Sequence, residues 1–220
     1  MQSRLWKNAM NKCLMCDKVI ENVFTNIFDD CDKFCYECIK KFEVRNKKFV
    51  INDVKGIILY FYNDFFKDVL FRYKGCGDYV LKDIFLVNSL FWIKRKYRGC
   101  KIILAPSNNE LEDKRGFNHL EGIFKCLNFP IIKCFKKDKM WKQSDKSKEE
   151  RKQIQNVIKI DKAALLDVKK VLIVDDVLTS GSTIKTMISQ IPSNIVKKVL
   201  VLSSNCRILK NEIVWNCFLK

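Results

Sequence analysis

The sequence predicts an α/β fold, with a parallel sheet flanked by helices and a small cysteine-containing unit ahead of it. The chain has 220 residues, enough for one main domain with a core and a small appendage. Short apolar runs typical of buried strands alternate with segments whose apolar residues recur at helical spacing. Two Cys-x-x-Cys pairs lie near the start of the chain. We therefore expect a small unit at residues 1–50 and an α/β domain at residues 51–220.

The overall composition is that of a soluble globular protein, with 48% apolar and 30% charged residues. No stretch reaches the roughly 18 to 20 apolar residues of a membrane span. Residues 1–13 lack the continuous apolar core of a signal peptide, so the sequence predicts a cytoplasmic protein. Cytoplasmic thiols stay reduced, and the 11 cysteines therefore favour metal binding or burial over disulfides.

The four cysteines of the two pairs, Cys13, Cys16, Cys35 and Cys38, have the spacing of a zinc site. Each tight Cys-x-x-Cys turn points two sulfur atoms at one centre, and a unit this small needs such a metal to fold. Four thiolates fill the coordination shell, so the Zn²⁺ would be structural rather than catalytic. Two alternatives stay open: Cys31 replaces one ligand, or the thiols are reduced and bind no metal.

The elements of the larger domain follow from apolar spacing and from chain-breaking residues. Gly99 ends a long helical pattern, and Pro106 stops the short apolar strand before it. A charged stretch between Lys136 and Arg151 has few residues that could pack, and we interpret it as a mobile loop or surface linker entering a helix near Ser147. We expect strands at 50–62, 101–105, 170–174 and 198–203, helices at 64–72, 79–97, 119–127 and 183–191, and a glycine-containing loop at 73–78.

One of these strands, 171–174, runs directly into two carboxylates and a hydroxyl-rich turn. Asp175 and Asp176 come at the carboxyl end of the strand, where parallel α/β sheets place their ligands. The turn offers backbone N–H groups and the positive end of the next helix, which together favour an anion. Its residues are Thr179, Ser180, Gly181, Ser182 and Thr183.

This segment resembles the motif with which type I phosphoribosyltransferases bind phosphoribosyl pyrophosphate (PRPP). The resemblance implies that Asp175 and Asp176 bind the ribose 2- and 3-hydroxyls and that residues 179–183 surround the 5-phosphate. Ser180 replaces a threonine that is common in the family and keeps its hydroxyl. The alternative is a strand, turn and helix that bind no phosphate.

The whole chain resembles the ComF family, competence-associated relatives of amidophosphoribosyltransferase. The segments that carry this resemblance occur in family order: the cysteine pairs, the loop from Lys74 to Asp78, Arg115-Gly116-Phe117-Asn118, Gln143, residues 147–151 with Asn156, and the PRPP motif. The resemblance implies that Lys74, Arg115 and Arg151 contact anionic ligand groups and that Mg²⁺ accompanies the leaving pyrophosphate. His119 stands where glutamine is common, and we interpret it as a helix-start residue rather than a base.

The predicted function is therefore a PRPP-binding, phosphoribosyltransferase-like protein of the ComF type, linked to DNA uptake and competence or to nucleotide metabolism. Whether catalysis is retained stays open. The alternative is a non-catalytic scaffold that senses nucleotides or binds single-stranded DNA beside DNA-uptake proteins. The net charge of +17 favours it, with Trp141 as a stacking residue among lysines. The same charge also fits a lysine-rich composition produced by an AT-rich genome.

Overall fold

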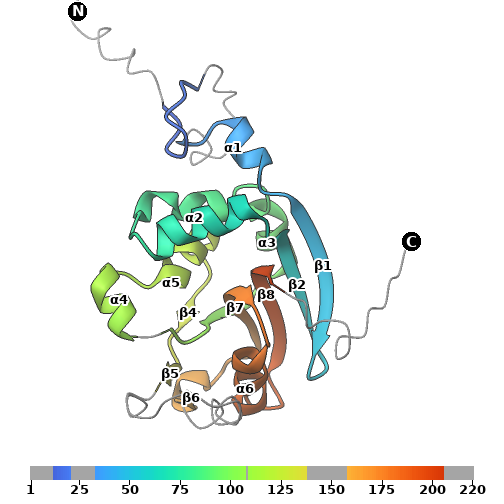
Figure 1. Ribbon diagram of the computed structural model, residues 1–220. Helices are drawn as coiled ribbons and strands as arrows, with labels where there is room; N and C mark the ends of the chain where they lie inside the picture. The colour runs from blue at the N-terminus through green and yellow to red at the C-terminus, as the bar shows by residue number, and fades with distance from the viewer. Residues whose placement is uncertain (1–11, 21–32, 108, 138–157, 206–220) are drawn as a thin grey trace, which may run out of the picture.

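The computed structural model describes residues 12–20, 33–107, 109–137 and 158–205. They form a six-stranded sheet with helices packed around it, and the N-terminal unit lies at one end of the molecule (Figure 1). The strand order is β1-β2-β8-β7-β3-β4. The bounds are β1 Val44–Ile51, β2 Val54–Phe61, β3 Lys101–Leu104, β4 Ile131–Ile132, β7 Lys170–Leu178 and β8 Val196–Ser204.

The sheet is mostly parallel, as predicted. All neighbouring strands from β2 to β4 run parallel, and β1 alone joins its neighbour in the antiparallel direction. The central strand β7 lies between β3 and β8, and residues 171–174 are completely buried. A strand that is buried on both faces has a continuous run of apolar residues, and this run is why the strand could be predicted from the sequence.

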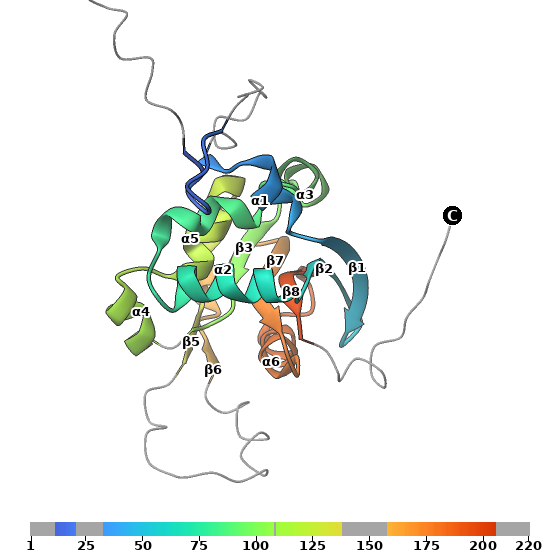
Figure 2. The same ribbon diagram turned by 45° about the horizontal axis from the view of Figure 1, so that its top comes forward.

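The helices lie in two groups around the strands. In both views α2, α3 and α5 lie near one another and α6 lies apart from them (Figures 1 and 2). The α-helices are α1 Tyr36–Lys40, α2 Asp64–Lys74, α3 Leu90–Lys96, α4 Asn109–Arg115, α5 His119–Phe124 and α6 Ser182–Gln190, and the 3-10 helices are η2 Tyr79–Phe85, η3 Lys125–Leu127 and η5 Ala163–Leu165. Among the described residues, no helix combines the length and the apolar character that crossing a membrane requires.

The helix predicted at 79–97 is wrong as a single element. The structure has η2, an interruption at residues 86–89, and then α3. Two polar side chains in the interruption bind other parts of the chain: Asn88 Nδ2 donates to the Ile39 carbonyl at 3.2 Å, and Ser89 Oγ lies 3.5 Å from the Tyr60 hydroxyl. The interruption therefore coincides with tertiary contacts that helical periodicity does not encode.

Strand β1 was not predicted, and it bears on the boundary expected at residue 50. β1 pairs with β2 from Val44 to Ile51, through a hairpin whose Asn52 and Asp53 both have positive φ values of 45° and 61°. Asn and Asp tolerate this conformation better than most residues, so the pair was a usable hairpin signal. A boundary before Val44 fits the strand pairing better than one at residue 50.

The N-terminal unit is packed onto the α/β domain. Phe42, just after α1, is buried. Its ring centroid lies 5.2–6.0 Å from the ring centroids of Tyr60, Phe65, Phe66 and Phe85. At the C-terminal end of α2, Arg72 Nη1 donates to the Met15 carbonyl at 3.3 Å. The unit thus shares an aromatic core and a polar contact with α2.

The loop expected between Lys136 and Arg151 lies largely outside the described residues, together with Gln143, Ser147 and Asn156. The chain on either side of residues 138–157 forms a two-stranded antiparallel sheet, β5 Phe135–Lys137 with β6 Ile158–Ile160.

Candidate ligand site and metal centre

Two adjacent carboxylates lie near the end of the central strand β7. Pairing with β3 stops at Val174, opposite Leu104, whereas pairing with β8 continues to Leu178. Asp175 and Asp176 therefore come directly after the last pair on the β3 side. A parallel sheet places ligands at this carboxyl end of its strands.

The turn after β7 brings hydroxyl groups together before α6. Gly181 has φ 72° and ψ 3°, a left-handed conformation that glycine adopts with little cost, and α6 begins at Ser182. Ser180 Oγ and Ser182 Oγ lie 2.8 Å apart, and Ser182 N donates to Ser180 Oγ at 3.4 Å. Thr179 is exposed and Thr183 is half-buried. Backbone N–H groups and hydroxyls at a helix N-terminus suit a phosphate group.

Two side chains from distant elements lie against the carboxylate of Asp176. Lys74 Nζ, at the C-terminal residue of α2, donates to Asp176 Oδ2. His119 Nε2, at the first residue of α5, lies 3.2 Å from the same oxygen. The other oxygen, Oδ1, accepts from the Val177 N–H at 2.7 Å. Lys74 was predicted as a site residue on a loop, but the structure places it on the last turn of a helix.

His119 is the neighbour that the sequence analysis missed. It does start a helix as expected, with Asn118 Oδ1 capping α5 by accepting from Glu121 N at 2.9 Å. However, it is 2% exposed, and neither ring nitrogen has a well-aligned hydrogen bond within the described ranges. Its carbonyl accepts from the Tyr73 hydroxyl at 2.8 Å. The only signal in the sequence was that it is the single histidine of the chain, next to a capping asparagine.

Burial and charge move the pKa values of this cluster in different directions. Burial raises the pKa of Asp175 to about 8, and the neighbouring Asp176 carboxylate adds to that increase. Burial alone would raise the pKa of Asp176 as well, but His119 and the Lys74 ammonium outweigh it and hold the pKa below its ordinary value. Burial lowers the pKa of His119, so the ring is neutral near pH 7. The aspartate pair thus carries about one negative charge.

Arg115 approaches the same region from the end of α4. Its Nε donates to the Leu111 carbonyl at 2.7 Å, and its Nη1 is buried without a hydrogen-bond partner among the residues that the structure describes. The Arg115 charge is one of the causes that lower the pKa of His119. A buried guanidinium nitrogen without a partner is suited to an anionic group.

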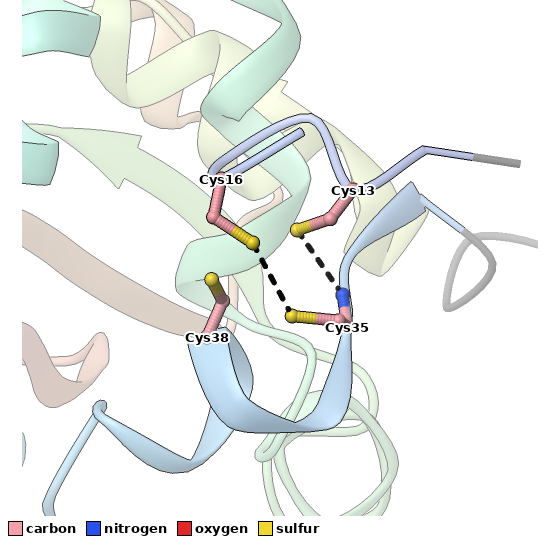
Figure 3. A group of neighbouring side chains, drawn as sticks. All are labelled: Cys13, Cys16, Cys35 and Cys38. Carbon is pink, nitrogen blue, oxygen red and sulfur yellow. Dashed lines mark hydrogen bonds between the residues drawn. The ribbon is translucent and has the colours of Figure 1, made fainter. Parts of the chain in front are cut away.

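The four predicted zinc ligands converge at the N-terminal unit (Figure 3). The Sγ atoms of Cys13, Cys16, Cys35 and Cys38 all lie within 4.8 Å of one another, with Cys16 and Cys35 only 3.6 Å apart. Zinc with four thiolates at about 2.3 Å requires sulfur separations of this size. The cluster therefore fits a tetrahedral metal ion. Cys31, the alternative ligand, lies outside the described residues.

The surroundings of the cysteines also suit a cation. Backbone N–H groups of Cys35 and Met15 donate to Cys13 Sγ at 3.2 and 3.4 Å. Burial raises the pKa of the Cys13 thiol, but these N–H groups outweigh it and lower that pKa to about 7. Burial and the nearby sulfur atoms raise the pKa of Cys38. A divalent cation relieves this repulsion, since thiolates are the ligating form.

Two other predicted residues lie outside the described ranges, Trp141 and Arg151. Their roles in DNA stacking and in anion binding stay predictions, and the DNA-binding alternative rests on the net charge.

Comparison with known proteins agrees with this architecture. Residues 132–218 match the phosphoribosyl transferase domain family. The chain is 26% identical to competence protein ComFC of Streptococcus pneumoniae (strain ATCC BAA-255 / R6), over 86% of this chain and 93% of the relative. It is 29% identical to competence protein ComFC of Bacillus subtilis (strain 168), over 57% of this chain and 53% of that protein.

Among solved structures, two crystal forms of a hypoxanthine phosphoribosyltransferase from Staphylococcus aureus are similar. Their TM-scores are 0.34 and 0.33, and their sequence identities are 16% and 13%. The matched regions make up 63% and 65% of this chain, and 64% and 69% of the two solved chains. In its sequence, its mostly parallel sheet and its four-cysteine cluster, the chain is similar to ComF-family competence proteins, and it contains a segment that matches the phosphoribosyl transferase domain family.

Proposed function

We propose that the chain binds PRPP at the turn between β7 and α6, with a structural Zn²⁺ in the four-cysteine cluster. One observation carries the PRPP proposal. Two adjacent carboxylates at the end of a central parallel strand are followed by a hydroxyl-rich turn with a left-handed glycine and by a helix N-terminus. All of this lies inside the segment that matches the phosphoribosyl transferase domain family.

Each part of PRPP has a chemically suitable partner in this arrangement. Asp175 and Asp176 accept hydrogen bonds from the ribose 2- and 3-hydroxyls. Residues 179–183 surround the 5-phosphate with hydroxyls and N–H groups. Lys74 and Arg115 supply positive charge for the pyrophosphate. Mg²⁺ that accompanies PRPP would supply further positive charge to the leaving pyrophosphate, beside Lys74 and Arg115.

The reaction that this arrangement supports is displacement at the ribose anomeric carbon. The bond from that carbon to the pyrophosphate oxygen breaks as a bond to the acceptor nitrogen forms, and the acceptor releases a proton. Positive charge develops on the ring in the transition state, and the negative charge of the Asp175 and Asp176 pair stabilises it from one face. The pyrophosphate leaves with the bonding electron pair.

The proposal predicts Mg²⁺-dependent PRPP binding that disappears when Asp175 and Asp176 are both changed to Asn. The double change keeps side-chain size and removes the acceptor charge, so affinity should fall at least about a hundredfold, or about 2.7 kcal/mol. Isothermal titration calorimetry measures this directly. A matched control, Asp53→Asn with Asp68→Asn, removes two exposed carboxylates and should leave affinity unchanged. Equal affinity in the site variant and in the wild type would contradict the proposal.

The relatives are named competence proteins, and we propose that this chain also acts in competence and the uptake of DNA. A catalytic role and a nucleotide-binding scaffold differ in one measurable product. A phosphoribosyltransferase releases pyrophosphate from PRPP in the presence of a base or amine, whereas a scaffold binds PRPP without turnover. Pyrophosphate detection across a panel of bases and amines distinguishes the two.

A further inference from the structure

We propose that Tyr73 is a positioning residue for the candidate ligand site, because its hydroxyl fixes the start of α5 on the end of α2. Those two helix ends carry Lys74 and His119, the side chains that lie against Asp176. Tyr73 therefore acts on the carboxylate through its neighbours. Its effect on PRPP affinity rests on the proposed function, whereas its effect on the place of His119 does not.

The Tyr73 side chain joins the two helices inside the protein. It is fully buried on the last turn of α2, and its hydroxyl donates to the His119 carbonyl at 2.8 Å. Its ring centroid lies 5.3 Å from that of Phe117, two residues before α5, and 5.4 Å from that of Phe85. Leaving a buried hydroxyl without a partner costs about 1–3 kcal/mol, so this hydrogen bond favours one placement of α5 against α2.

Gly122, in the middle of α5, leaves the space that the Tyr73 hydroxyl occupies. A Cβ at this position would overlap the hydroxyl, and it would lie 3.2 Å from Cε2 of Tyr79. A side chain here would therefore push the hydroxyl away from the His119 carbonyl. The glycine and the tyrosine thus form a close contact that depends on both residues.

One hydrogen bond bears on both neighbours of Asp176, because Lys74 follows Tyr73 in α2 and His119 supplies the acceptor. The His119 ring is buried, and within the described part of the chain neither of its nitrogens has a hydrogen bond that would fix it. The place of the ring therefore depends on the backbone of α5. Without the Tyr73 hydroxyl, α5 can shift on α2, and the ring loses its fixed place 3.2 Å from Asp176 Oδ2.

The test is a double-mutant cycle of Tyr73→Phe and Gly122→Ala, with PRPP affinity by calorimetry and the melting temperature as readouts. Tyr73→Phe removes the hydroxyl and should lower PRPP affinity about threefold to tenfold, as expected for one lost hydrogen bond. Gly122→Ala displaces the same hydroxyl and should lower both affinity and melting temperature. In the double variant the added methyl group fills the space left by the hydroxyl, so the melting temperature should recover while the affinity stays low. A role in packing alone would restore both.

A second readout needs no ligand, because His119 is the single histidine of the chain. Its ring signals in the nuclear magnetic resonance spectrum of the ligand-free protein should form one sharp set in the wild type. They should split or broaden in Tyr73→Phe and in the double variant, because the ring then exchanges between positions.

The control is Tyr60→Phe, which removes another buried hydroxyl, 3.5 Å from Ser89 Oγ. It should change the melting temperature only. Wild-type PRPP affinity in Tyr73→Phe, or an affinity that recovers in the double variant, would overturn the inference while leaving the PRPP site intact. A wild-type chain that binds no PRPP would overturn the proposed function instead, and unchanged His119 signals in Tyr73→Phe would then overturn the inference as well.

Discussion

At the residue scale, the two neighbouring aspartates differ in their protonation. Asp175 has a pKa of about 8 because its carboxyl is buried beside another carboxylate. Asp176 keeps its charge because Lys74 and His119 lie against it. The sequence identified both aspartates from their place after a strand. It could not identify their partners, because residues 74 and 119 approach Asp176 only after α2, α5 and β7 have packed.

This asymmetry predicts how stability depends on pH. A folded-state pKa of about 8 for Asp175, against 3.8 for an unperturbed aspartate, means that the folded chain keeps a proton that the unfolded chain releases. The free energy of unfolding from this group therefore falls as pH rises from about 4 to about 8 and then levels off. Asp175→Asn removes this dependence, so its melting temperature should match the wild type near pH 4 and exceed it at pH 8.

The gain at pH 8 should be at least about 2–4 °C, which corresponds to about 1 kcal/mol for a chain of this size. Thermal melting of the ligand-free protein from pH 4 to pH 9 measures it. Asp53→Asn, at an exposed hairpin residue, should follow the wild-type curve throughout. If the difference in melting temperature between Asp175→Asn and the wild type does not grow with pH, then Asp175 is charged in the folded chain.

At the scale of the elements, prediction was best where local patterning and burial agree. Three predicted strands, 101–105, 170–174 and 198–203, are confirmed within a few residues. Three predicted helices, 64–72, 119–127 and 183–191, are confirmed as closely, except that a short 3-10 turn forms the end of the segment 119–127. Patterning failed where tertiary contacts decide, as at the interruption after η2. It also failed for β1, whose residues 45–48 are all polar.

The turn before α6 is sensitive to a single added methyl group at Gly181. Gly181→Ala places a side chain at φ 72°, and its Cβ would lie 2.9 Å from Ile51 Cδ1. We expect a loss of about 1–2 kcal/mol in stability from the left-handed backbone, and a further loss of PRPP affinity because the added methyl group crowds the turn against the Ile51 side chain. Melting and calorimetry on the same sample separate the two effects.

Gly77→Ala is the matched control for this change. Gly77 has φ 76°, but an added Cβ would meet no atom within 4 Å. It should lose similar stability and keep PRPP affinity. If Gly181→Ala binds PRPP as tightly as Gly77→Ala does, then the conformation of the turn does not matter for the ligand.

At the scale of the whole molecule, the cysteine cluster and the sheet belong to one packed structure. The cysteine spacing predicted the cluster, and its four sulfur atoms do converge. The spacing could not predict that Phe42 joins the rings of Tyr60, Phe65, Phe66 and Phe85, because these contacts join distant parts of the chain.

Purified without chelator, the protein should contain one zinc ion per chain, measured by elemental analysis. Cys38→Ser should abolish zinc retention, because Cys38 is buried and a hydroxyl is a poor substitute for a thiolate ligand. Limited proteolysis should then cut before Val44 while the sheet stays folded. Cys76→Ser, at an exposed cysteine outside the cluster, should retain the metal and the resistance to proteolysis. Absence of zinc from the wild type would refute the assignment.

The last turn of helix α2 contacts both the cysteine cluster and the candidate ligand site, through residues only two positions apart. Arg72 binds the carbonyl of Met15, between the first two cysteines, and Lys74 binds Asp176. A shift of this turn changes both contacts at once. Any effect of metal occupancy on ligand affinity through α2 must be matched by an equal effect of the ligand on metal affinity, since such linkage is reciprocal. The last turn of α2 is therefore a short structural connection through which metal binding and ligand binding can be thermodynamically coupled.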